Sequence, residues 1–125
     1  MSPWLFLAVS LAGGLGASLR FVLDGIIRTR FDGPVPKGTI LINISGSFLL
    51  GLLTGLVASN LLPQTWLPIL GAGFLGGYTT FSTTSVETVR LVMAGEWRAS
   101  VLSGIGTLIG SVGAAGIGLW LASLV

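Results

Sequence analysis

Residues 76–85 read Gly-Gly-Tyr-Thr-Thr-Phe-Ser-Thr-Thr-Ser, and apolar sequence flanks them on both sides. Consecutive glycines followed by β-branched and hydroxyl residues make a poor continuous helix. Within a membrane, a broken helix is tolerated where its freed backbone groups line a cavity or bind ions. The stretch therefore predicts a helix that is broken in the middle of the membrane. A simple kink packed against a neighbouring helix is the alternative.

The composition around this stretch is typical of a membrane protein. Of the 125 residues, 52% are hydrophobic and 8% are charged, whereas soluble proteins contain about 25% charged residues. A helix needs about 20 apolar residues to cross a bilayer, and prolines and short polar turns divide the chain into four such segments. We expect an all-α membrane protein with a single domain, residues 1–125. The four transmembrane helices are expected at about 3–27, 39–62, 67–93 and 99–125.

Several classes of function are excluded by the residues that are missing. The chain has no cysteine and no histidine, which removes disulfides, thiol nucleophiles, imidazole bases and the usual transition-metal ligands. Only four residues are acidic, and no base and nucleophile pair is visible, so we do not expect an enzyme. The few basic residues lie at segment ends, which indicates topology signals and no nucleic-acid surface.

The basic residues are concentrated on one side of the expected bundle. The turn around Gln64 has none, so the positive-inside rule places both termini outside. The basic residues near the other side are Arg28, Arg30, Lys37, Arg90 and Arg98.

Two polar stripes run along the expected helices. On the second helix Asn43, Ser47, Gly51 and Gly55 are four residues apart and share one face. The Asn43 amide either donates to a passing anion or joins two helices, and both interpretations remain open.

On the fourth helix the stripe consists of Ser103, Thr107 and Ser111. Its hydroxyls either line a path or bond to carbonyls of their own helix. Two polar stripes in so small a bundle favour a narrow wet path. A separate stripe of small residues, which predicts close helix packing, comprises Gly106, Gly110, Ala114 and Gly118.

Arg20 is the basic residue closest to the apolar part of the first segment. Asp24 follows it by one helical turn, as Arg90 follows Glu87 in the third segment, and such spacings permit local pairs. Arg20 either pairs in this way, reaches the membrane interface, or attracts anions into a vestibule.

Three stretches together carry a resemblance to a known family. They are Gly-Gly-Leu-Gly-Ala-Ser-Leu-Arg at 13–20, Gly-Thr-Ile-Leu-Ile-Asn-Ile-Ser-Gly-Ser-Phe at 38–48, and Gly-Gly-Tyr-Thr-Thr-Phe-Ser-Thr at 76–83. In this combination the chain resembles the bacterial fluoride channel family, also called the camphor-resistance or Fluc family, over nearly its whole length.

The resemblance implies a multi-pass protein of the bacterial inner membrane that lets fluoride leave the cell passively. It implies an antiparallel dimer of two copies inserted in opposite directions, with two pores along their interface. It also implies a structural sodium ion at the dimer interface, held by backbone carbonyls of Gly76 and Thr79 from both subunits. The pore residues that match the family are Asn43, Phe81, Ser103, Thr107 and Ser111, with Arg20 as a vestibule candidate.

Two features depart from the family pattern. Family members usually carry a second phenylalanine three residues after the first, and Thr84 stands at that position. The one-sided basic residues fit poorly with insertion in both directions, so a distinct partner subunit is an alternative to the homodimer. A small proton-coupled exporter is disfavoured because residues 5–19 contain no acid, and a structural subunit without transport is the remaining alternative.

Overall fold

The computed structural model describes all 125 residues as helices and short connections, without a strand. The first two spans are single helices, α1 (Pro3–Arg30) and α2 (Lys37–Ala58). The third span consists of η1 (Leu67–Leu75, π-helical), α3 (Gly76–Tyr78) and α4 (Ser82–Met93). The fourth consists of α5 (Trp97–Val101), η2 (Leu102–Gly106, π-helical) and α6 (Thr107–Ser123).

Local sequence explains where the first two spans begin and end. The Ser2 hydroxyl accepts the Leu5 N–H at 3.1 Å, and Pro3 occupies the first helical position, where its missing N–H is harmless. α1 continues to Arg30, three residues beyond the expected end at 27. α2 stops at Ala58, before the expected 62, because Asn60 adopts φ 60° in the left-handed region.

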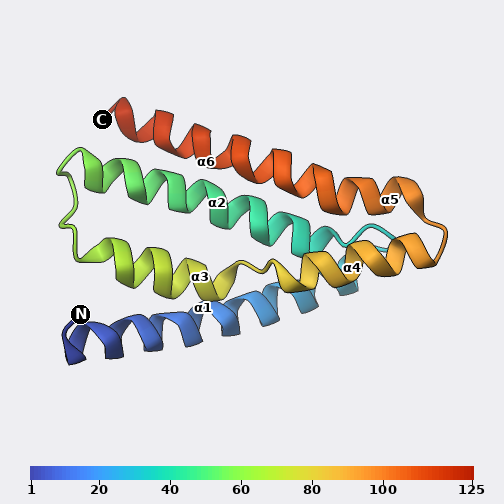
Figure 1. Cartoon of the computed structure of the whole chain (residues 1–125), viewed down its shortest axis with the longest axis horizontal. Coiled ribbons are helices and arrows are strands. Elements are labelled where there is room, and N and C mark those ends of the chain that lie inside the picture. The colour runs from blue at the N-terminus through green and yellow to red at the C-terminus, as the bar shows by residue number, and fades with distance from the viewer.

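The four spans lie side by side and alternate in direction (Figure 1). α2 packs along α6 on one side and against η1 on the other, and α1 packs against η1 and α3. Three helical segments, Pro3–Arg30, Lys37–Ala58 and Trp97–Ser123, are long and apolar enough to cross a membrane. Only 21 of 125 residues are buried, so most apolar side chains face outward, where lipid or another subunit can cover them.

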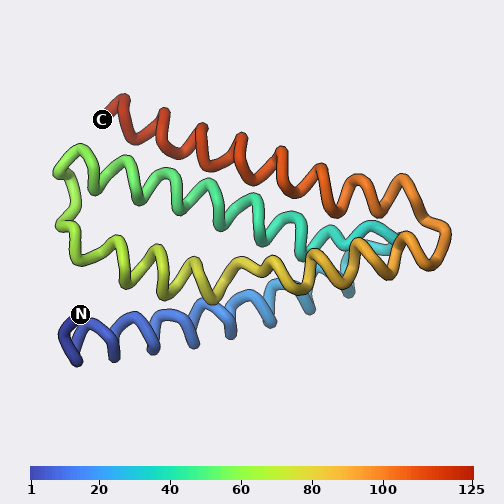
Figure 2. The backbone as a smooth tube through the Cα atoms, in the orientation of Figure 1, coloured from blue at the N-terminus to red at the C-terminus, as the bar shows by residue number.

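Both termini lie at one end of the molecule, together with the connection between α2 and η1 (Figure 2). The connection between α1 and α2 and the turn between α4 and α5 lie at the opposite end. Since the basic residues other than Arg20 lie near these two connections, the residues that the positive-inside rule counts are concentrated at that end.

Glycines allow the spans to approach closely. A Cβ at Gly51 would overlap the Ala115 carbonyl oxygen, and one at Gly118 would overlap that of Phe48, so α2 and α6 meet backbone to backbone. Gly16 holds α1 equally close to the Phe74 carbonyl. Small residues serve this purpose in membranes because association there depends on close packing.

We expect Gly51→Ala to destabilise the fold, because its added methyl group would push α6 away from α2. Overpacking of this kind costs about 1–3 kcal/mol, and thermal unfolding of the purified protein in detergent measures it. Gly113→Ala is the matched control, since a Cβ at Gly113 meets nothing within 4 Å. Equal unfolding temperatures for the two variants would contradict this account of the packing.

Candidate functional site

The third span is not hydrogen-bonded as one continuous helix. α3 ends at Tyr78, Thr79 is extended at φ −83° and ψ 161°, and α4 begins at Ser82. The Thr80 N–H, which would bond to the Gly76 carbonyl in a regular helix, donates to Asn43 Oδ1 at 2.8 Å. The Asn43 amide nitrogen in turn donates to the Thr80 carbonyl oxygen at 2.8 Å. One side chain of α2 therefore satisfies both backbone groups of Thr80.

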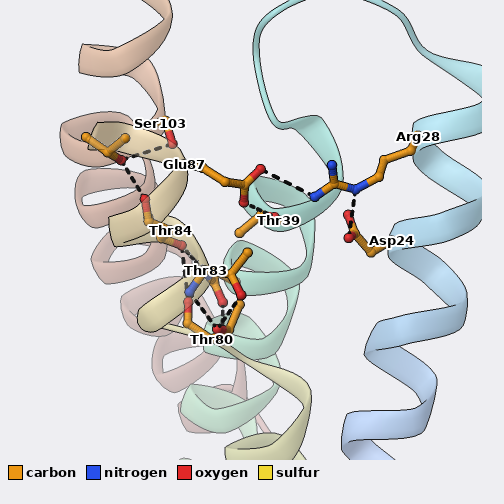
Figure 3. Close-up of polar contacts among 10 residues, drawn as sticks. Asp24, Arg28, Thr39, Thr80, Thr83, Thr84, Glu87 and Ser103 are labelled. Atoms are coloured by element: carbon orange, nitrogen blue, oxygen red, sulfur yellow. Dashed lines mark hydrogen bonds and ion pairs between the residues drawn. The ribbon is translucent and has the colours of Figure 1, made fainter. Parts of the chain in front are cut away.

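Hydroxyl groups of α4 complete this polar cluster (Figure 3). Thr84 Oγ1 accepts from Asn43 Nδ2 at 2.8 Å and donates to the Thr80 carbonyl at 3.1 Å. Thr80 Oγ1 accepts the Thr83 N–H at 3.2 Å. The regular helical donors of two carbonyls, those of Gly76 and Thr79, are thus engaged elsewhere.

A groove of about 350 Å³ lies beside the break. It brings together four of the five residues expected in the pore, namely Asn43, Phe81, Thr107 and Ser111. Gly76 and Thr79, expected at the sodium site, border the same groove. Its lining also includes Ser47, Thr80 and Thr84, and it contains no ionisable side chain.

Some polar side chains that line the groove are hydrogen-bonded within the chain, and others have no partner. Asn43 is buried and bonded on both sides of its amide. Thr107 Oγ1 and Ser111 Oγ are shielded and have no hydrogen-bond partner in the chain, although buried polar groups are almost always paired. Phe81 is 87% exposed, so its ring extends away from the rest of the chain.

The fifth expected pore residue, Ser103, does not line the groove. Its side chain is fully buried and contacts the Thr88 hydroxyl at 3.2 Å. Thr88 also donates to the Thr84 carbonyl at 2.7 Å, and Figure 3 shows how Ser103 faces α4. In this subunit Ser103 therefore joins η2 to α4.

Arg20 lies in a second cavity, on the other side of the break, together with Asp24, Thr39, Thr80 and Thr83. Its Nε is buried and has no hydrogen-bond partner. The local pair of Arg20 with Asp24 is not formed.

Arg28 forms the ion pairs with Asp24 and Glu87 in place of Arg20 and Arg90. Its guanidinium bonds to Asp24 at 2.9 Å and to Glu87 at 3.4 Å. The Glu87 carboxylate also accepts a hydrogen bond from the Thr39 hydroxyl at 2.6 Å (Figure 3). The pair of Glu87 with Arg90 that the spacing permits is not formed, because Arg28 and Thr39 bind that carboxylate from two other helices.

Comparison with known proteins decides the family. Residues 7–119 match the family described as CrcB-like protein, Camphor Resistance (CrcB). The chain belongs to this family. It is 53% identical to the fluoride-specific ion channel FluC 1 of Leifsonia xyli subsp. xyli over 124 residues, which cover 99% of this chain and 90% of that protein. It is 50% identical to FluC 2 of Cutibacterium acnes over 118 residues, covering 94% and 96% of the two chains.

More distant relatives with the same description align over similar lengths. FluC 1 of Bacillus thuringiensis subsp. konkukian is 40% identical over 119 residues, which cover 94% of this chain and 87% of that protein. Membership in this CrcB family confirms the resemblance that the three sequence stretches carry. It also accords with the long apolar helices, and the chain is a multi-pass membrane protein.

Sequence reasoning did not single out three residues for the polar contacts that they make around the break. Thr39 lies four residues before Asn43, so the stripe on α2 already extended to it. Thr84 was recognised only as a departure from the family pattern, although it bonds Asn43 directly. Arg28 lies four residues after Asp24, a spacing that permits their pair, whereas its bond to Glu87 joins residues 59 positions apart and has no local signal.

We expect Asn43→Ala to destabilise the break, because it leaves the Thr80 N–H without a partner and leaves the Thr80 carbonyl with only the Thr84 hydroxyl. Each unsatisfied buried group costs about 1–3 kcal/mol, so thermal unfolding in detergent should show a clear decrease. Ser47→Ala is the matched control, since Ser47 lies one turn further along α2 and lines the same groove. Similar unfolding temperatures for both variants would show that Asn43 does not stabilise the break.

Proposed function

We propose that this chain is the subunit of a fluoride-selective channel that lets fluoride leave the cytoplasm passively across the bacterial inner membrane. The observation that carries the proposal is the groove that gathers Asn43, Phe81, Thr107 and Ser111 beside the helix break. The relatives of this chain are named fluoride-specific ion channels. Their family is one of channels and not of enzymes.

The lining of the groove suits a small, strongly hydrated anion. A selective path must replace the water around fluoride with hydrogen-bond donors. Thr107 and Ser111 have hydroxyls that no group of the chain engages. The edge of an aromatic ring carries partial positive charge, and the exposed Phe81 ring can present such an edge.

The same groove disfavours a proton-coupled exporter. Such a transporter needs a group that binds and releases protons along its path. All residues that line the groove are neutral and not ionisable at physiological pH. We therefore expect fluoride to move down its electrochemical gradient, without a requirement for a pH gradient.

The proposal includes an antiparallel dimer whose subunits meet at the broken spans. α4 has 12 residues, and η1 and α3 before the break have nine and three, so the break is central in its span and would lie at the middle of the membrane. Phe81 is exposed and the groove is open to one side, which leaves room for a second subunit to complete the path.

The second subunit is a second copy of this chain in our proposal. The positive charge at one end of the molecule supports the alternative of a distinct partner with the opposite bias, because the positive-inside rule then fixes each orientation.

A structural sodium ion at this interface fits the residues present. The Gly76 and Thr79 carbonyls lack their usual helical donors because the N–H groups of Thr80 and Thr83 bond elsewhere. Freed carbonyls of broken helices suit sodium, and two antiparallel copies would contribute both pairs. When bound, the ion would supply a fixed positive charge between the subunits.

Fluoride efflux from liposomes that contain only this purified chain tests the function, with an ionophore to dissipate voltage and chloride as the comparison ion. We expect rapid fluoride loss, negligible chloride loss and no effect of an imposed pH gradient. Absence of efflux from the chain alone would contradict the homodimer and point to a distinct partner subunit.

Two substitutions test the path itself. Asn43→Asp should abolish fluoride efflux by placing a negative charge beside the groove, and Phe81→Ala should slow it at least tenfold by removing the ring. Phe6→Ala is the control, since Phe6 is an exposed phenylalanine of α1 that does not line the groove. Normal efflux from both test variants would remove Asn43 and Phe81 from the path.

Sodium should stabilise the protein more than other monovalent cations do. A ligand that binds only the folded state raises stability by about 2.7 kcal/mol at one hundred times its dissociation constant. We expect the unfolding temperature in detergent to rise with sodium chloride but not with the chloride of N-methyl-D-glucamine at equal ionic strength. Equal curves in both salts would contradict the sodium site.

A further inference from the structure

We propose that Thr84 is a positioning residue whose hydroxyl holds the Asn43 amide on the helix break and so keeps that amide from binding fluoride. This inference rests on the proposed function and concerns the one position where the chain lacks the aromatic side chain usual in the family. It assigns the task of donating to the anion to Thr107 and Ser111.

The Asn43 amide has no free hydrogen in this structure. Its oxygen accepts the Thr80 N–H, and its nitrogen donates one hydrogen to the Thr80 carbonyl and the other to Thr84 Oγ1, each at 2.8 Å. An amide nitrogen carries two hydrogens, so both are engaged. The pairing with a backbone donor and a backbone acceptor also fixes the orientation, because a flipped amide would place like groups against each other.

Thr84 is itself firmly oriented. Its hydroxyl donates to the Thr80 carbonyl one helical turn earlier, at 3.1 Å, while accepting from Asn43. A β-branched side chain has few allowed rotamers in a helix, and this backbone bond selects one of them. The hydroxyl thus points at Asn43 from the first turn of α4 (Figure 3 shows Thr84 and Thr80).

Unlike the Asn43 amide, the two hydroxyls across the groove form no hydrogen bond within the chain. Thr107 Oγ1 and Ser111 Oγ have no partner in the chain, although both are shielded from water. Both side chains line the groove together with Asn43. A passing anion therefore meets free donors on the α6 side and an amide with no spare hydrogen on the α2 side.

Removal of the Thr84 hydroxyl should release one hydrogen of Asn43 toward the groove. Thr84→Val keeps the shape of the side chain and removes the hydroxyl, whereas Thr84→Ser keeps the hydroxyl and serves as the matched control. One additional hydrogen bond to the anion should tighten fluoride binding about fivefold. The valine variant should therefore be half-saturated at lower fluoride than the wild type, and the serine variant should resemble the wild type.

Fluoride binding can be measured without transport. The purified chain in detergent is titrated with sodium fluoride at constant total sodium, balanced with sodium gluconate, and the rise in unfolding temperature gives the half-saturating concentration. The expected result is a fivefold decrease for Thr84→Val and none for Thr84→Ser. In Asn43→Ala, the further change Thr84→Val should have no effect on fluoride binding, because there is no amide to release.

An unchanged or weaker fluoride affinity in Thr84→Val would overturn the proposal. The proposal would also be overturned if Thr84→Val tightened fluoride binding equally in the Asn43→Ala variant, since the effect would then not depend on the Asn43 amide. If the variants that lack Asn43 do not fold, the proposal is still tested by comparing the fluoride affinities of Thr84→Val and Thr84→Ser. Failure of the proposed function is recognised separately, as wild-type protein that binds fluoride in detergent but releases none from liposomes.

Discussion

The pairing of the Asn43 amide with both backbone groups of Thr80 is the interaction on which the rest of the site depends. A break in a membrane helix exposes backbone N–H and C=O groups, and nothing in hydrocarbon can satisfy them. An asparagine side chain presents a donor and an acceptor at the spacing of a peptide group. The Asn43 side chain can therefore replace the helical hydrogen bonds that Thr80 lacks. The cost of the break is met at Thr80, while the carbonyls of Gly76 and Thr79 lose their regular helical donors.

This pairing is possible only because α2 lies close to the broken span. Gly46, less than one turn after Asn43, faces Thr79 and Tyr78 so tightly that a Cβ there would overlap the Thr79 side chain. The Tyr78 hydroxyl meets Ser45 at 3.0 Å on the same helix. One turn of α2 therefore meets three requirements of the contact. Gly46 leaves space for Thr79, Ser45 bonds to the Tyr78 hydroxyl, and Asn43 supplies the amide. The polar chemistry of the break and the packing of small residues are two aspects of one contact.

The sequence predicted the groove better than it predicted the details of the contacts. Composition and spacing indicated an all-helical membrane protein, and the glycine and hydroxyl pattern at 76–85 drew attention to the segment that is interrupted. Ser103 was grouped with Thr107 and Ser111 on the assumption of a regular α-helix, but η2 is π-helical over Leu102–Gly106. A π-helix turns less per residue, so a spacing of four does not keep Ser103 on the groove face. The bond of Arg28 to Glu87 depends on tertiary structure that no local pattern contains.

Under the proposed function, the separation of charged and neutral polar groups would let a small chain offer a path to a hydrated anion. Its internal ion pairs, Arg28 with Asp24 and Glu87, lie near the basic end and join α1 to α4. The groove beside the break contains only neutral donors and acceptors. A charged side chain in direct contact with the anion would hold fluoride more tightly than a neutral donor does, since charge interactions are strong at low dielectric. Several modest hydrogen bonds can instead replace water around the ion one at a time, which allows both entry and exit.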